Sequence, residues 1–278
     1  MQGACYAQAE HIFKNLVEES KNKLVGNDLR FVDYKTNLAL LYYEQGKYSE
    51  AEPLYKEALE ILIKSLGRNH PDVATTMNNL AGLYYEQGKY SEAEPLYKEA
   101  LEILIKSLGR NHPNVANTMS NLAGLYNEQG KYSEAEQLYK EALEILIKSL
   151  GRNHPNVAAT MSNLAGLYYE QGKYSEAEPL YKEALEILIK SLGRNHPDVA
   201  ANMSNLAGLY YEQGKYSEAE QLYKEALEIL IKSLGRNHPY VANTMNNLAW
   251  LYYEQGKYSE AEPLYREALE ILIKSLGR

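Results

Sequence analysis

The sequence predicts an all-α protein built from repeated antiparallel helix pairs. The first observation is a period of 42 residues: one phrase, Glu-Gln-Gly-Lys-Tyr-Ser-Glu-Ala-Glu, begins at Glu44, Glu86, Glu128, Glu170, Glu212 and Glu254. A fixed period of this length is typical of stacked supersecondary units, each of which buries its apolar face against its neighbours. The second observation is that apolar residues within each period recur at helical spacing. The predicted fold class is therefore an α-solenoid.

The unit over 69–110 begins with the first helix of a pair. We expect His70 and Pro71 to open it, because proline is favoured at the first helical position, where its missing N–H costs nothing. Four apolar residues then share one helical face: Met77, Leu80, Ala81 and Tyr84. The spacing predicts a helix over roughly 72–87, ended by Gly88 just beyond the C-cap.

The second helix of the unit is predicted over roughly 91–108. Ser91 and Glu94 match the S-x-x-E capping box, which predicts the helix start. Pro95 would then fall in the first turn, where proline is tolerated. The apolar stripe continues through Ala93, Leu96, Tyr97, Ala100, Leu101, Leu104 and Leu108. Each unit is therefore predicted to be two helices joined by a tight turn.

Composition argues against several classes of protein. The net charge is −8, and charges of both signs are scattered along each repeat. Nucleic-acid binding needs a basic face, and membrane-surface helices are basic and amphipathic, but the sequence shows neither pattern. No apolar run approaches the ~20 residues of a membrane span. We therefore expect neither nucleic acid nor membrane as a partner.

The single cysteine, Cys5, cannot build a disulfide framework, so nothing in the cysteine usage indicates secretion. The first residues also lack the charged and apolar regions of a signal peptide. We expect a cytoplasmic protein.

The sequence offers no candidate for catalysis. One histidine lies at each repeat boundary: His70, His112, His154, His196 and His238. Equivalent residues are displaced by about 10 Å, one helix diameter, so these side chains cannot converge on a metal, and we expect them to serve in loops and caps. Nucleotide-binding and nucleophile motifs are missing, and near-identical repeats supply little of the asymmetry that a catalytic site needs. We expect no enzyme activity, catalytic residue, metal or cofactor.

The repeat resembles a known family. The tetratricopeptide signature is matched by Met77-x-x-Leu80-Ala81-x-x-Tyr84, then Ala93-x-x-x-Tyr97, Ala100 and Pro113. The longer unit, with its His-Pro-x-Val-Ala, Asn-Leu-Ala and Gln-Gly-Lys-Tyr phrases, resembles the repeats of kinesin light chains and related repeats attached to bacterial regulatory proteins. The resemblance implies a right-handed superhelix whose concave groove holds protein or peptide partners.

The two ends of the array differ in sequence. Ala9-Glu10 aligns with Ala51-Glu52, so we expect residues 1–30 to form a degenerate half-repeat that caps six helix pairs over 31–278, in one continuous solenoid. The last predicted helix keeps the apolar run Ile271–Ile273 without a following repeat. That helix would expose the face on which another repeat packs.

Differences between repeats fall on one stripe of the first helix, opposite its core residues. The family resemblance directs this stripe toward the concave groove. The candidate groove residues are Asn79, Asn121, Asn163, Asn205, Asn247, Tyr85, Asn127, Tyr169, Tyr211, Tyr253 and Trp250. Amides can clamp a peptide backbone and tyrosine adds flat contact area. In the alternative, each asparagine bonds a neighbouring helix, and Trp250, near Tyr253 and Tyr240, fills space.

Glycines on the same stripe have two explanations. Gly82, Gly124, Gly166 and Gly208 lie inside predicted helices, where glycine costs ~1 kcal/mol relative to alanine. Either a ligand backbone approaches closely, or a tyrosine from the next repeat needs the room. Chaperone-tail binders of the family clamp a carboxylate with Lys or Arg, which the candidate positions lack.

The sequence therefore predicts a protein-interaction scaffold that holds an extended peptide or partner segment in its groove. The alternative is a structural module that forms homo-oligomers by stacking through its last repeat.

Overall fold

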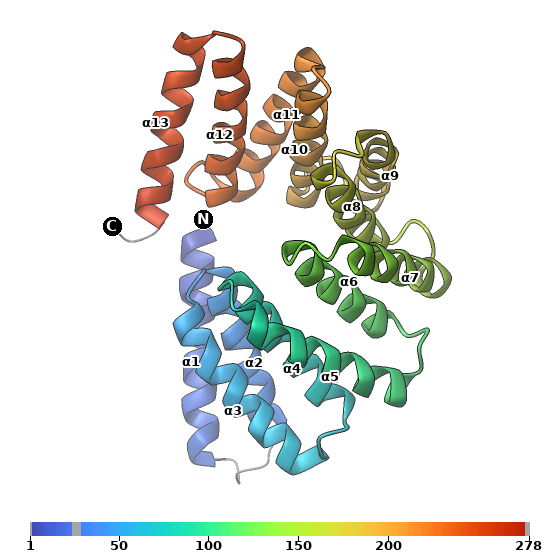
Figure 1. Ribbon diagram of the computed structural model, residues 1–278. Helices are drawn as coiled ribbons and strands as arrows, with labels where there is room; N and C mark the ends of the chain where they lie inside the picture. Colours follow the sequence, from blue (N-terminus) through green and yellow to red (C-terminus); the bar gives the residue numbers. More distant parts are fainter. Residues whose placement is uncertain (1, 24–28, 276–278) are drawn as a thin grey trace. The chain divides into compact units, whose positions relative to one another are not determined.

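The computed structural model describes residues 2–23 and 29–275, where every regular element is an α-helix (Figure 1). The helices are α1 (Gln2–Lys23), α2 (Leu29–Glu44), α3 (Tyr48–Leu66), α4 (Pro71–Glu86), α5 (Tyr90–Leu108), α6 (Pro113–Glu128), α7 (Tyr132–Leu150), α8 (Pro155–Glu170), α9 (Tyr174–Leu192), α10 (Pro197–Glu212), α11 (Tyr216–Leu234), α12 (Pro239–Glu254) and α13 (Tyr258–Ser275). They form two compact units, Met1–Ile145 and Leu146–Arg278, whose boundary falls within α7.

Within each unit the helices pack in repeated pairs. The even-numbered helices α2 to α12, which we call A helices, each have 16 residues and precede a longer B helix. Each A helix packs against its B helix across a short turn, and the B helix then packs against the next A helix, as α8, α9 and α10 do (Figure 1). The predicted all-α class with paired helices is confirmed.

Histidine and proline together begin the A helices from α4 to α12. Pro71 is the first residue of α4, and Nδ1 of His70 accepts a hydrogen bond from the Asp72 N–H at 3.2 Å. The same cap recurs at His112, His154, His196 and His238. A histidine that accepts at Nδ1 satisfies one of the N–H groups that a helix start leaves unpaired. The prediction that these histidines serve as caps is confirmed.

A glycine in the left-handed region closes each A helix. Gly88 has a φ of 70°, and its N–H donates to the carbonyl of Tyr85 at 2.9 Å. The Lys89 N–H donates to the Tyr84 carbonyl at 2.8 Å, which reverses the chain within three residues. Glycine adopts this conformation without the steric cost that a Cβ would add.

The predicted capping box at the start of the B helix is wrong. Helix α5 begins at Tyr90, because the tight turn already lets the Lys89 carbonyl accept a bond from the Ala93 N–H at 3.1 Å. Ser91 therefore lies inside the first turn, where its Oγ donates to Glu92 at 2.6 Å. Pro95 lies inside the helix rather than in its first turn.

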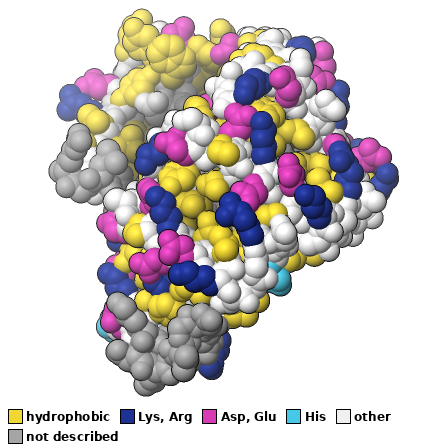
Figure 2. Space-filling model, turned by 60° about the horizontal axis from the view of Figure 1, so that its bottom comes forward, with side chains coloured by type: hydrophobic (Ala, Val, Ile, Leu, Met, Phe, Trp, Pro, Cys, Tyr) yellow, Lys and Arg dark blue, Asp and Glu magenta, His cyan; other side chains and the backbone are white. Residues whose placement is uncertain are grey.

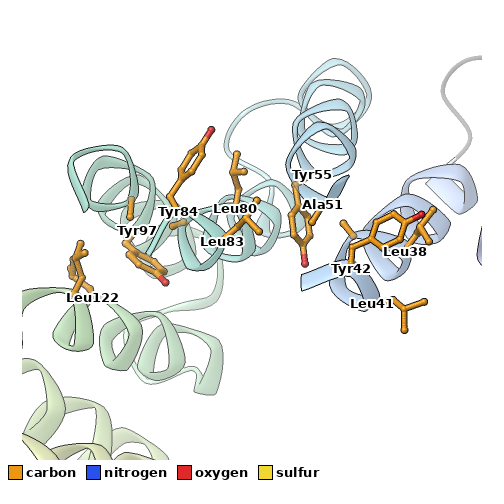
Figure 3. Close-up of a cluster of buried hydrophobic side chains, with 14 residues drawn as sticks. Leu38, Leu41, Tyr42, Ala51, Tyr55, Leu80, Leu83, Tyr84, Tyr97 and Leu122 are labelled. Atoms are coloured by element: carbon orange, nitrogen blue, oxygen red, sulfur yellow. The ribbon is translucent and has the colours of Figure 1, made fainter. Parts of the chain in front are cut away.

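Figure 3 shows the core of the first unit, to which successive helices from α2 to α6 contribute side chains. The cluster includes Leu38, Leu41, Tyr42, Ala51, Tyr55, Leu80, Leu83, Tyr84, Tyr97 and Leu122. Ala51 and Ala81 are completely buried, and these small side chains let neighbouring helices approach closely. Burial of apolar area from both sides of each helix stabilises the stack.

Ion pairs join consecutive helix pairs. Arg152 Nε lies 2.6 Å from Glu183 Oε1, and Lys215 Nζ lies 3.2 Å from Glu178 Oε2. At the start of the chain, Glu10 of α1 pairs with Lys47 at 3.1 Å, as Glu52 pairs with Lys89 at 3.6 Å. Figure 2 shows Lys and Arg interspersed with Asp and Glu across one face.

Helix α1 packs against α2, and its Glu10 reaches Lys47 in the turn after α2. Helix α1 thus takes the place that a B helix takes before each later A helix. The cap predicted over residues 1–30 lies partly outside the described residues, which omit residues 1 and 24–28. The continuous six-pair organisation stays a prediction. None of the described helices is both long and apolar enough to cross a membrane.

Candidate functional site

The candidate residues lie on the side of the A helices that faces away from the core. In α8, Val157, Met161 and Leu164 are buried, whereas Asn163 is exposed and Tyr169 is half-buried. Equivalent positions behave alike: Asn121, Asn205, Asn247, Trp250 and Tyr253 are exposed, and Asn79, Tyr85, Asn127 and Tyr211 are half-buried. The stripe is therefore accessible to a ligand in both units.

The candidate asparagines differ in whether their side chains are hydrogen-bonded within the protein. Asn121 Nδ2 donates to Asn78 Oδ1 at 3.1 Å, which links α6 to α4. This bond matches the alternative in which asparagine joins neighbouring helices. In the part of the second unit that the structure describes, Asn163, Asn205 and Asn247 make no side-chain hydrogen bond within the protein. These three amides keep their donors and acceptors available.

The helical glycines face a tyrosine hydroxyl. A Cβ added at Gly82 would lie 3.4 Å from Tyr97 Oη, and one at Gly166 would lie 3.5 Å from Tyr181 Oη. The neighbouring tyrosine belongs to the B helix of the same pair and not to the next repeat, and the Cβ would meet its hydroxyl at an ordinary contact distance. Where the position carries Trp250, the side chain is 49% exposed, so a large residue there turns outward.

The structure brings three of the candidate residues together. Trp250 Nε1 donates to Tyr211 Oη at 2.9 Å, and the Trp250 ring stacks on Tyr253 with centroids 5.8 Å apart. The predicted neighbour Tyr240 instead lies against His238, at a centroid separation of 5.0 Å. Trp250 is thus fixed by contacts with two helices while half of its surface stays exposed.

Sequence reasoning missed the tyrosine that begins each B helix. Tyr216 lies 5.8 Å from Tyr211 between ring centroids, and Tyr258 lies 5.3 Å from Tyr253. In α6 the position equivalent to Tyr211 is occupied by Asn127, so Tyr132 at the start of the next helix has no tyrosine partner there. Tyr132 is 39% exposed. The signal was present in the sequence, because Tyr-Tyr-Glu-Gln-Gly-Lys-Tyr places two tyrosines across a reversing turn.

Carboxylates accompany these ring pairs. Each A helix ends in glutamate, and the five A helices α4, α6, α8, α10 and α12 contain no lysine or arginine. The hydroxyl of Tyr90 donates to Glu128 at 3.5 Å, and that of Tyr174 donates to Glu212 at 3.4 Å. Desolvation raises the pKa of Tyr174, and the Glu212 charge raises it further.

The last B helix presents an exposed apolar surface. Ile271 is 2% exposed, because it packs inward, so not every residue of the apolar run Ile271–Ile273 lies on the exposed face. Leu269 and Ile273 are 59% and 44% exposed. Groups of His, Cys, Asp and Glu able to hold a metal are not found among the described residues.

Comparison with known proteins places these features in a family. The family model described as tetratricopeptide repeat matches residues 32–106, 92–148, 115–190, 156–232 and 198–274. No curated protein sequence matches.

Solved structures resemble this chain over most of its length. BtubC (BKLC) from P. vanneervenii is 27% identical, with a TM-score of 0.65, over 85% of this chain and 92% of that one. A Podosopora anserina putative kinesin light chain with nearly identical TPR-like repeats is 30% identical, with a TM-score of 0.59, over 74% and 98%. The apo form of RapI is 22% identical, with a TM-score of 0.70, over 100% and 99%, and shows the fold alone. The chain belongs to the tetratricopeptide repeat family, and its 42-residue repeats are similar to those of kinesin light chain-like proteins.

Proposed function

We propose that this protein is an interaction scaffold that holds an extended peptide or partner segment along the exposed side of its A helices. Members of the tetratricopeptide repeat family generally mediate interactions between proteins and are a non-enzymatic scaffold type. The observation that carries the proposal is the row of amides at Asn163, Asn205 and Asn247. These side chains are exposed, and among the described residues their amide groups donate no hydrogen bond to another part of the protein. A cytoplasmic location is part of the proposal.

The chemistry of this row suits a peptide backbone. An amide side chain offers both a donor and an acceptor, which is what an extended backbone also presents at each residue. Asparagine is a poor residue in the middle of a helix, so its repetition at one exposed position indicates a role other than helix stability. The half-buried Tyr169 and Tyr211 add flat rings beside the amides.

The test is affinity capture from a lysate of the source cells, read by mass spectrometry. The triple variant Asn163→Ala, Asn205→Ala, Asn247→Ala removes the row of amides from the second unit. Its matched control makes the same change at three exposed asparagines in the loops between helix pairs: Asn153, Asn195 and Asn237. We expect a specific partner to bind the wild type and the control but not the triple variant. Equal recovery by both variants would contradict the proposal.

A second candidate function is self-association through α13, favoured by the exposed Leu269 and Ile273. The variant Leu269→Lys would place a charge in such an interface, whereas Ser259→Lys adds the same charge at another exposed position of α13. Light scattering over a range of concentrations should then show an oligomer that only Leu269→Lys dissociates. A mass that stays monomeric at every concentration rules this candidate out.

A further inference from the structure

Four exposed aromatic rings and one half-buried ring form a continuous surface on the last two helix pairs. The rings touch in sequence, from Tyr216 to Tyr211, Trp250, Tyr253 and Tyr258, and we call this set the aromatic patch. Tyr216, Trp250, Tyr253 and Tyr258 are between 44% and 61% exposed. A contiguous group of exposed aromatic side chains is typical of an interaction site. The contacts between the rings hold these side chains in place, so that binding a ligand would immobilise few additional side chains and cost little entropy.

Carboxylates border the aromatic patch. Glu212 and Glu254 are the last residues of α10 and α12, directly after Tyr211 and Tyr253. A helix C-terminus carries partial negative charge, so glutamate there strengthens the local negative potential. Burial raises the pKa of Tyr211, and the charges of Glu254 and Glu212 raise it further.

The nearby cations do not neutralise these carboxylates. Lys257, in the turn after Glu254, reaches back to Glu220 at 3.4 Å and lies over the Tyr252 ring at 5.4 Å. Over the described residues of the second unit, neither Glu212 nor Glu254 makes an ion pair. Glu212 accepts a hydrogen bond from the Tyr174 hydroxyl, but both carboxylates are exposed and keep their negative charge without an ion-pair partner in this part of the structure.

The protein's own lysines show what such a surface binds. At the junction of α11 with α12, Lys224 Nζ lies 2.6 Å from Glu220 and 5.8 Å from the centroid of Tyr252. Each of these cations thus meets a carboxylate and a ring at once, a combination in which ion pairing and cation–π attraction act together. The aromatic patch offers the same two groups to an external cation.

We propose that the aromatic patch, with Glu212 and Glu254, binds an arginine side chain of a basic partner segment. A guanidinium is planar, stacks on aromatic faces and pairs with carboxylates, which makes arginine the side chain that matches this surface best. The inference rests on the proposed function, because Tyr211, Trp250 and Tyr253 belong to the candidate surface. It names the chemistry of the partner: basic rather than acidic.

Trp250 makes the test direct, because it is the single tryptophan of the chain and lies in the aromatic patch. The full chain is titrated with a synthetic peptide in which three arginines are separated by glycine and serine. We expect a saturable change in Trp250 fluorescence that weakens as salt is added. Matched peptides carrying glutamine or glutamate in place of arginine should give no change up to about 1 mM.

Charge variants separate the aromatic patch from the overall negative charge. The double variant Glu212→Gln, Glu254→Gln should weaken binding of the arginine peptide about tenfold. The double variant Glu60→Gln, Glu102→Gln removes the same charge from two exposed positions on α3 and α5 and should leave the affinity unchanged.

Trp250→Gly tests the rings, since glycine is the residue that α10 carries at this position and the helix accommodates it. Binding is then read from the fluorescence anisotropy of a labelled arginine peptide. We expect Trp250→Gly to lower the affinity for this peptide about tenfold. Equal weakening by both charge variants, equal binding of the glutamate peptide or an unchanged Trp250 signal would overturn the inference.

The two proposals fail in different ways. If the asparagine variant loses its cellular partner while the arginine peptide leaves Trp250 unaffected, the scaffold function stands and the inference is wrong. If the asparagine variant and its control recover the same proteins, the scaffold proposal fails, and the peptide titration still decides whether the aromatic patch binds arginine.

Discussion

Helices α9 and α13 have the same sequence over 18 residues except for Lys182 and Arg266, yet their surroundings differ. Helix α9 packs against α8 and α10, while α13 packs against α12. As a result Tyr181 and Leu188 are 4% and 5% exposed, whereas the equivalent Tyr265 and Leu272 are only partly buried. The comparison teaches that part of the burial of a B helix comes from the next A helix and not from its own sequence.

The largest expected effect comes from removing the same leucine in the two helices. Leu188→Ala should lower the free energy of unfolding by ~2–5 kcal/mol, because the lost contacts leave a cavity. Leu272→Ala, at the equivalent but less buried site, should cost ~1 kcal/mol. Urea denaturation of both variants measures the difference. Equal losses would mean that α13 gains as much from burial as α9.

A smaller effect is expected from the glutamate near the start of each helix. Glu178 accepts hydrogen bonds from Lys182, Gln213 and Lys215, whereas Glu262 pairs with Arg266. The bond from Lys182 is the main cause that lowers the pKa of Glu178 to about 2. A carboxylate whose pKa is lowered by folding stabilises the fold above its ordinary pKa of 4.5 and loses this contribution as pH falls toward 2.

Glu178→Gln should therefore cost ~1 kcal/mol near neutral pH, and the cost should disappear toward pH 2. Glu262→Gln, which removes a single exposed pair, should cost less at neutral pH. Thermal unfolding over a series of pH values compares the two variants. A cost for Glu178→Gln that does not vary with pH would contradict the assignment of the ion pairs.

The smallest effect concerns the A helices of the same two pairs. Gly166 of α8 should tolerate alanine, since the new Cβ would lie 3.5 Å from the flexible end of Tyr181, an ordinary contact distance. Gly166→Ala should raise the free energy of unfolding by ~0.5–1 kcal/mol through helix propensity. Trp250 shows that the equivalent position of α12 accepts a larger side chain. Calorimetry that instead reports a lower Tm would show that the glycine is needed for packing.

The sequence was sufficient for the helix pairs, because apolar spacing, His-Pro and Gly signals are local and recur in every repeat. It misplaced the start of the B helix, since the turn through Gly88 and Lys89 supplies the first helical acceptor before Ser91 is reached. The contact of Tyr211 with Tyr216 depends on how two helices meet across that turn. The difference between α9 and α13 is beyond any local pattern, because the residues are the same and only the neighbouring helix differs.

The ion pair between Lys215 and Glu178 has a consequence for how the array unfolds locally. Because Lys215 lies beyond α10, the ion pair exists only while α9 and α10 stay docked. Ion pairs of this kind couple each B helix to the A helix that follows it, so the contact between two helix pairs opens as one unit. Local unfolding should therefore begin at a B helix that has a neighbour on one side only and spread from there into the array. Backbone amides of α13 should therefore exchange with solvent deuterons sooner than those of α9, which is held on both sides.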